Sequence, residues 1–238
     1  MRLINVIAQH QEQGTSLRAL IDACKLDRTT AWRMLQSLQH LGLVVQDADS
    51  SLYHLGLQAT AWGATSFTHC ALIAQCTPVM KTLARLSGDN VFLVLRLGDH
   101  SHCLHLEAGT HAVRSFNQTV GEMRLLGLGV GSIAMLAALS DEAVLQHHRR
   151  HSEAYALEGV GAAQLQRWVL NTRQRGFAYR NTAGIAAVGL HWSLGAGAIA
   201  AMSIGASKAR LPLSRATELA PVMARHMQAL RAPVPTPA

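Results

Sequence analysis

The chain has 238 residues, 49 % of them hydrophobic and 15 % charged, which favours a folded protein of two domains and excludes a largely disordered one. The net charge of +7 is weak evidence for nucleic-acid binding, because residues 1–58 carry five basic and five acidic side chains and the whole excess lies in residues 59–238. With no long apolar run, no signal peptide and four scattered cysteines, we expect a reduced cytoplasmic protein without a membrane span.

Three short helices are predicted in the first forty residues. Apolar residues recur at helical spacing over 2–11, Ser16 can cap a second helix, and Asp27 can cap a third helix over 28–41. The buried stripe of the third helix is predicted to contain Ala31, Met34, Leu35, Leu38 and Leu41. Residues 25–27 form a tight turn between the second and third helices, which indicates a helix-turn-helix.

The outer face of the third helix carries the side chains that phosphates and base edges require. Arginine suits guanine in the major groove, glutamine suits adenine, and an apolar group can touch a thymine methyl. The predicted DNA-binding residues are Arg28, Thr29, Thr30, Trp32, Arg33 and Gln36. The alternative is an ordinary solvated helix face, but the tight turn and the hairpin that follows favour DNA reading.

A hairpin is predicted after this helix, with strands at 43–46 and 52–55 and a turn at 47–51. A hairpin in this place is the wing of a winged helix-turn-helix. We therefore predict a DNA-binding domain over residues 1–58.

The rest of the chain is predicted to hold a linker helix at 59–76, an effector-binding domain at 77–232 and a flexible tail at 233–238. Pro78 is expected to begin a new helix, because proline cannot donate a backbone hydrogen bond inside one. Strands are predicted at 91–96, 103–108, 113–116, 185–190 and 198–204, and helices at 133–139, 141–151, 164–175 and 214–231. This order indicates an α+β fold with an antiparallel sheet.

The order and spacing of several segments resemble the IclR family of bacterial transcriptional regulators. The resemblance covers nearly the whole chain and rests on residues 16–20, 26–35, 41–44, 53–56, 120–122, 126–139, 175–178 and 200–204. It implies a winged helix-turn-helix, a linker helix and a GAF-like domain that binds a small effector. It also implies a homodimer or tetramer on operator DNA, and an effector site with Val130, Gly131, Asn181, Ala187, Ser203 and Gly205.

The wing departs from the family pattern. Leu52 and His54 stand where the family commonly has arginine, and Asp47 and Asp49 lie at the tip. We therefore expect weak contact between the wing and DNA phosphates.

A glycine-rich loop containing Gly127, Gly129 and Gly131 precedes the predicted helix at 133–139. Its backbone N–H groups can favour an anion such as a carboxylate at the helix start. A nucleotide site is disfavoured, because the strand and the downstream acid of a dinucleotide fold are missing. The glycines can alternatively serve only close packing of the helix on the sheet.

Metal binding and catalysis are both disfavoured, and no cofactor is expected. The histidines near Cys103 do not complete a regular ligand set, and His147, His148 and His151 are interpreted as a solvated basic helix face. Ser132 lacks the glycine spacing of a hydrolase nucleophile. The prediction is a DNA-binding regulator and not an enzyme; the alternatives are a hydrolase-like enzyme or a ligand-binding module without DNA specificity.

Overall fold

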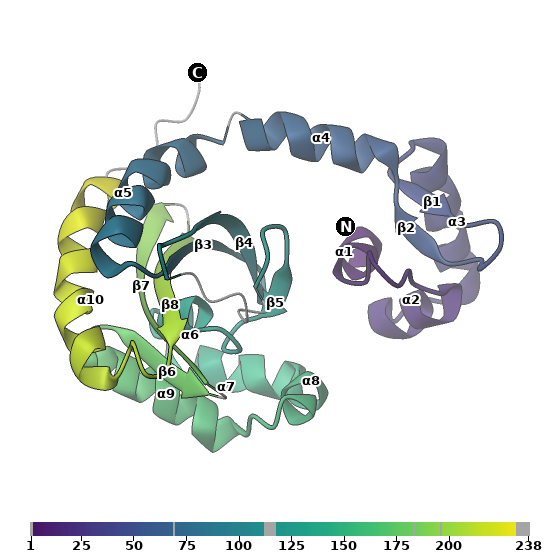
Figure 1. The fold of residues 1–238 in the computed structure, drawn as a ribbon. Helices are drawn as coiled ribbons and strands as arrows, with labels where there is room; N and C mark the ends of the chain where they lie inside the picture. Colours follow the sequence, from purple (N-terminus) through teal and green to yellow (C-terminus); the bar gives the residue numbers. More distant parts are fainter. Residues whose placement is uncertain (1, 69, 112–117, 183, 196, 232–238) are drawn as a thin grey trace. The chain divides into compact units, whose positions relative to one another are not determined.

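The computed structural model describes residues 2–68, 70–111, 118–182, 184–195 and 197–231 (Figure 1). The chain divides into two compact units, Met1–Cys70 and Ala71–Ala238. The predicted strand at 113–116 and the predicted tail at 233–238 lie outside the described residues. Within the described ranges, no helix is both long and apolar enough to cross a membrane.

The first unit is a winged helix-turn-helix, as predicted. Its elements are α1 (Arg2–Gln9), α2 (Leu17–Cys24), α3 (Arg28–His40), β1 (Val44–Gln46), β2 (Tyr53–Leu55) and α4 (Leu57–Thr68). Strands β1 and β2 pair in antiparallel fashion, and Thr15 forms a bridge with Tyr53. Leu3, Ile7 and Leu20 are fully buried in the small core that joins the helices to the hairpin.

Local hydrogen bonds cap the starts of α2 and α3, and the backbone of Lys25 makes the turn between them. The Ser16 side chain accepts from the Ala19 N–H, and Asp27 Oδ1 accepts from the Thr30 N–H at 2.9 Å. Lys25 takes a left-handed conformation with φ of 54°, which ends α2 and turns the chain into α3. The predicted caps of both helices are therefore confirmed.

The predicted buried stripe of α3 is partly wrong. Ala31 and Leu35 are buried, but Met34 is 42 % exposed and Leu41 is 60 % exposed. Helix α2 and strand β1 pack most closely against α3, and its core-facing stripe is narrower than the apolar pattern suggested.

The second unit contains a six-stranded antiparallel sheet in the order β5-β4-β3-β8-β7-β6. The strands are β3 (Asn90–Leu97), β4 (His100–Glu107), β5 (Met123–Leu125), β6 (Ala178–Thr182), β7 (Ile185–Gly195) and β8 (Ala198–Ser207). The helices are α5 (Ala71–Ser87), α6 (Val130–Leu136), α7 (Asp141–Arg150), α8 (Ser152–Leu157), α9 (Ala162–Arg175), α10 (Leu213–Met227) and the short 3-10 helix Gln228–Arg231.

Helices cover both faces of this sheet (Figure 1). Side chains on β3 alternate between the two cores: Val91 and Leu93 pack with α5 and α10, while Phe92 and Val94 pack with the helices from α6 to α9. The predicted α+β class and GAF-like architecture are confirmed by this antiparallel sheet between two helical layers.

The predicted helix break at Pro78 is wrong. Helix α5 runs through Pro78, and the predicted linker segment 59–76 contains parts of both α4 and α5. Pro78 and Ala74 are both exposed, so the carbonyl that loses its partner can face solvent. Thr77 does not cap a helix; its hydroxyl donates to the Ile73 carbonyl at 2.7 Å.

Three short elements, β5, β6 and α8, were not predicted from the sequence. Helix α6 begins at Val130 rather than Ile133, which places Gly131 inside the helix.

Candidate DNA-reading helix and effector cavity

The six predicted DNA-binding side chains all lie on exposed positions of α3. Thr29, Arg33 and Gln36 lie on the side of the helix opposite Ala31 and Leu35, which are fully buried. Trp32 is 51 % exposed beside them, although it is a large aromatic residue. The core fixes one side of α3 and leaves two arginines, a threonine pair, an indole and an amide available to an external partner.

The wing offers little positive charge. Asp47 Oδ1 accepts from the N–H and the hydroxyl of Ser50, both at 2.7 Å, and these hydrogen bonds lower the pKa of Asp47. His54 Nδ1 lies 3.0 Å from the Gln11 carbonyl within the same unit. The Asp47 carboxylate is thus held ionised, and the one histidine of β2 already contacts the segment that follows α1.

The second unit contains a cavity of about 370 Å³ between the sheet and the start of α6. Two arginines and one glutamate stand among its lining residues, with apolar side chains from β3, β7 and α6. The lining consists of Phe92, Gln118, Arg124, Leu128, Gly129, Val130, Glu158, Arg180, Thr182, Ile185, Ala186, Ala187 and Ser203.

Arg180 is the most firmly held charge of this cavity. Its Nη1 donates to the Leu128 carbonyl at 2.7 Å, and its guanidinium lies over the Trp168 ring. Burial lowers the pKa of Arg180, the charge of Arg124 lowers it further, and Glu158 acts in the opposite direction. Arginine nevertheless stays protonated in proteins, so the site has a desolvated positive charge that favours an anion.

Three of the six predicted effector-site residues line the cavity: Val130, Ala187 and Ser203. The other three are not among its lining residues. Asn181 is exposed on β6 between two lining residues, and Gly205 is buried on β8 opposite Ala187. A Cβ on Gly131 would meet Val94 Cγ2 at 2.8 Å, so this glycine permits close packing of α6 on the sheet.

The glycine loop does not present all of its N–H groups to a ligand. The amides of Gly127 and Gly129 both donate to Ser132 Oγ, at 2.9 and 3.1 Å, and the Ser132 hydroxyl donates to the Gly129 carbonyl. These two amides are therefore not free for an anion, and Arg124 and Arg180 are the positively charged residues of the cavity lining. The only signal of these two arginines in the sequence is the basic excess of residues 59–238.

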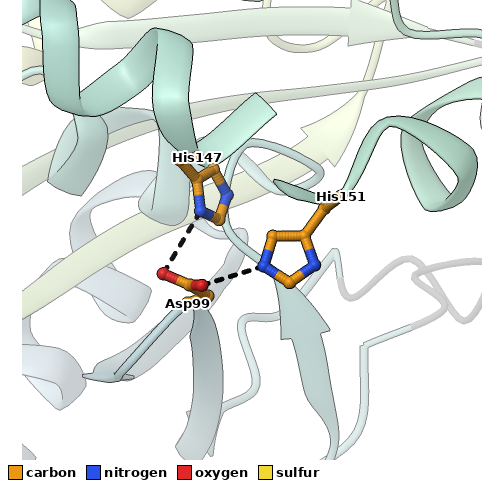
Figure 2. Close-up of side chains that lie close together, drawn as sticks. All are labelled: Asp99, His147 and His151. Atoms are coloured by element: carbon orange, nitrogen blue, oxygen red, sulfur yellow. Dashed lines mark hydrogen bonds and ion pairs between the residues drawn. The ribbon is translucent and has the colours of Figure 1, made fainter. Parts of the chain in front are cut away.

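The interpretation of His147 and its neighbours as a solvated face is wrong in part. His147 is buried, and both His147 and His151 face Asp99 (Figure 2). These three residues form the only cluster of three or more potential metal ligands within the described part of the chain. The histidines near Cys103 are not brought together in this way.

A winged helix-turn-helix followed by a GAF-like unit is the architecture of a class of transcriptional regulators. Comparisons with known proteins point to the same class. Residues 1–48 match the family model of the IclR helix-turn-helix domain. The chain is 26 % identical over 144 residues to the HTH-type transcriptional regulator KipR of Bacillus subtilis, and 27 % identical over 183 residues to the acetate operon repressor of Salmonella typhimurium. These alignments cover 60 % and 75 % of this chain, but only 56 % and 66 % of the two relatives.

The fold is also similar to that of an IclR family transcriptional regulator from Brucella abortus, solved as a crystal structure. The TM-score is 0.80 at 17 % identity, with 98 % of this chain and 90 % of that chain covered. Together these matches confirm the resemblance to the IclR family. The similar proteins are named as transcriptional regulators and not as enzymes, in agreement with the prediction.

Proposed function

We propose that this chain is a sequence-specific DNA-binding transcriptional regulator whose activity is controlled by a small organic anion. The observation that carries the first half is the exposed face of α3, where Arg28, Trp32, Arg33 and Gln36 surround Thr29 on a helix-turn-helix that matches the IclR model. In a helix-turn-helix, the second helix of the motif, here α3, enters the major groove, and its first turns lie deepest in the groove.

The effector is a carboxylate in this proposal. Arg124 and Arg180 bring two positive charges to one cavity, Glu158 brings one negative charge, and Phe92 and Ile185 supply apolar walls. A cavity of about 370 Å³ is of the size that holds small metabolites. Ser203, also in the lining, adds a hydroxyl that can orient the ligand.

The regulator is proposed to act in the cytoplasm as a homodimer or tetramer on operator DNA. The first unit has no net charge and a poorly basic wing, so a single copy gains little from phosphate attraction. Two copies of α3 on one operator would supply the missing affinity. The boundaries 1–58, 59–76 and 77–232 belong to this proposal as the reading, linking and effector-binding parts.

A binding assay with DNA from just upstream of the coding sequence tests this function. We expect sequence-selective retardation that weakens with added salt and survives an excess of scrambled competitor. Equal binding to upstream and scrambled DNA would support the alternative of a ligand-binding module without DNA specificity. The hydrolase alternative is not favoured, because the Ser132 hydroxyl is buried and bonded to the glycine loop.

A further inference from the structure

Asp99, His147 and His151 converge in the second unit, outside the effector cavity (Figure 2). Asp99 lies in the turn between β3 and β4, whereas His147 lies in α7 and His151 directly follows this helix. His147 Nδ1 is 3.4 Å from Asp99 Oδ1, and His151 Nε2 is 2.9 Å from Asp99 Oδ2. One potential ligand atom from each residue lies within 4.8 Å of the others.

This set has the chemistry of a transition-metal site. Imidazole nitrogens select zinc-like ions over magnesium or calcium, and a carboxylate oxygen completes a common set of three protein ligands. Metal–ligand bonds of about 2.0–2.2 Å place the ligand atoms of a tetrahedral ion about 3.3–3.6 Å apart. We propose that Asp99, His147 and His151 bind a divalent transition-metal ion such as Zn²⁺, with water at the remaining position.

The spacing of the histidines supports this assignment. His151 is the residue that caps the end of α7, four positions after His147, so the two side chains lie about one helical turn from each other. Their rings are 5.1 Å apart between centroids, close enough for both to reach one ion. The metal would therefore need only small side-chain rotations rather than a movement of the backbone.

The burial of the three side chains also suits a metal. The His147 side chain is 3 % exposed, while Asp99 and His151 are 25 % and 27 % exposed, which leaves one side of the site accessible to water.

Arg150 is the competing partner of Asp99. Its Nη2 lies 3.2 Å from Asp99 Oδ1, but the side chain is 61 % exposed. An exposed arginine gains little from such a pair and can turn into water when a metal takes its place.

The ion would join the β3–β4 turn to the end of α7. The Asp99 carbonyl also accepts from the Leu126 N–H at 3.0 Å, two residues before Leu128 in the cavity lining. The inference rests on this side-chain geometry and does not depend on the proposed regulatory function.

The test uses the untagged full chain, stripped of metal by a chelator and then dialysed. Zn²⁺ is titrated in competition with a chromophoric chelator, and Co²⁺ is titrated separately for its visible absorption. We expect a single ion per chain and visible Co²⁺ bands from a low-coordinate nitrogen and oxygen site. His151→Ala and Asp99→Asn should each weaken Zn²⁺ binding at least about tenfold and abolish the Co²⁺ bands.

The matched control is His105→Ala, since His105 belongs to the histidine group that the fold does not bring into the cluster. It should bind Zn²⁺ as the unmodified chain does. Circular dichroism checks that each variant is folded, and His151→Gln replaces His151→Ala if the latter does not fold. Absence of Zn²⁺ binding, unchanged affinity in both ligand variants, or an equal loss in His105→Ala would overturn the proposal.

Discussion

The guanidinium of Arg180 lies over the indole ring of Trp168, with its Cζ 4.4 Å from the ring centroid. This cation–π contact and the hydrogen bond from Nη1 to the Leu128 carbonyl fix the side chain at the wall of the cavity. The charge is thus held in place before any ligand arrives. A preorganised charge of this kind favours a carboxylate that can accept two parallel hydrogen bonds.

Arg180→Gln should therefore weaken effector binding. A panel of small mono- and dicarboxylates is screened for those that raise the melting temperature of the full chain. We expect at least one to do so, and its affinity to fall at least about tenfold in the variant, because a hydrogen bond to a charged group contributes about 1.5–3 kcal/mol.

Arg167→Gln, an exposed position on α9, is the matched control and should bind as the unmodified chain does. The corresponding neutral amides should not raise the melting temperature. An equal shift with the amides, or full affinity in Arg180→Gln, would argue against an anionic effector.

Ser132→Ala should destabilise the second unit. Ser132 Oγ accepts from the amides of Gly127 and Gly129, and Gly127 is buried. Leaving a buried donor without its partner costs about 1–3 kcal/mol. Chemical denaturation of the full chain measures this loss, with Ser152→Ala at an exposed position as the control. Unchanged stability would mean that the loop finds other partners.

His147 should make stability depend on pH. Burial lowers its pKa from the usual 6.5, so below that value the unfolded chain binds more protons than the folded chain. Stability is therefore lost as the pH falls from 6.5 toward the lowered pKa of the folded state. Measured in the presence of a chelator, the melting temperature should fall less steeply in His147→Gln than in the unmodified chain.

The pKa of His100 is also lowered by burial, so His147→Gln should keep part of the pH dependence of stability. Asp99 also makes the folded state less stable as the pH falls, but at lower pH, because its pKa in the folded state lies below the usual 3.8. Identical pH profiles of the two proteins would show that the His147 imidazole protonates as easily when folded as when unfolded.

The salt dependence of DNA binding should be modest. Residues 1–58 carry only five basic side chains, which five acidic ones offset, and the wing has no arginine. A plot of the logarithm of the binding constant against the logarithm of the salt concentration should have a shallow slope. Its magnitude should be far below ~10 per dimer, which is the slope of a protein with many phosphate contacts. A slope that steep would place more basic groups on the DNA than this account allows.

The reading helix could be predicted because its signals are local. Asp27 caps α3, the segment 25–27 turns the chain, and Gly42 takes φ of 67° just after the helix ends. The hairpin behind it follows from alternating residues around a polar turn. Each of these features involves neighbours in the sequence, so one sequence was enough.

The sites of the second unit could be predicted only in part, because they depend on tertiary packing. The family resemblance gave Val130, Ala187 and Ser203 of the cavity lining, but neither its arginines nor the cluster around Asp99. Arg180 reaches the Leu128 carbonyl across 52 positions of sequence, and His151 reaches Asp99 across the same separation. No periodic pattern marks such pairs. The helix through Pro78 was missed for a related reason: whether the freed carbonyl can reach solvent depends on the surface that the fold exposes.

Arg33→Ala tests the central claim most directly, through the dissociation constant of the full chain on its upstream DNA. Loss of a base or phosphate contact costs about 1–3 kcal/mol, so we expect binding at least about tenfold weaker with an unchanged melting temperature. Arg85→Ala, an exposed arginine of α5, should bind as the unmodified chain does. An unchanged dissociation constant for Arg33→Ala would contradict the assignment of α3 as the DNA-reading helix.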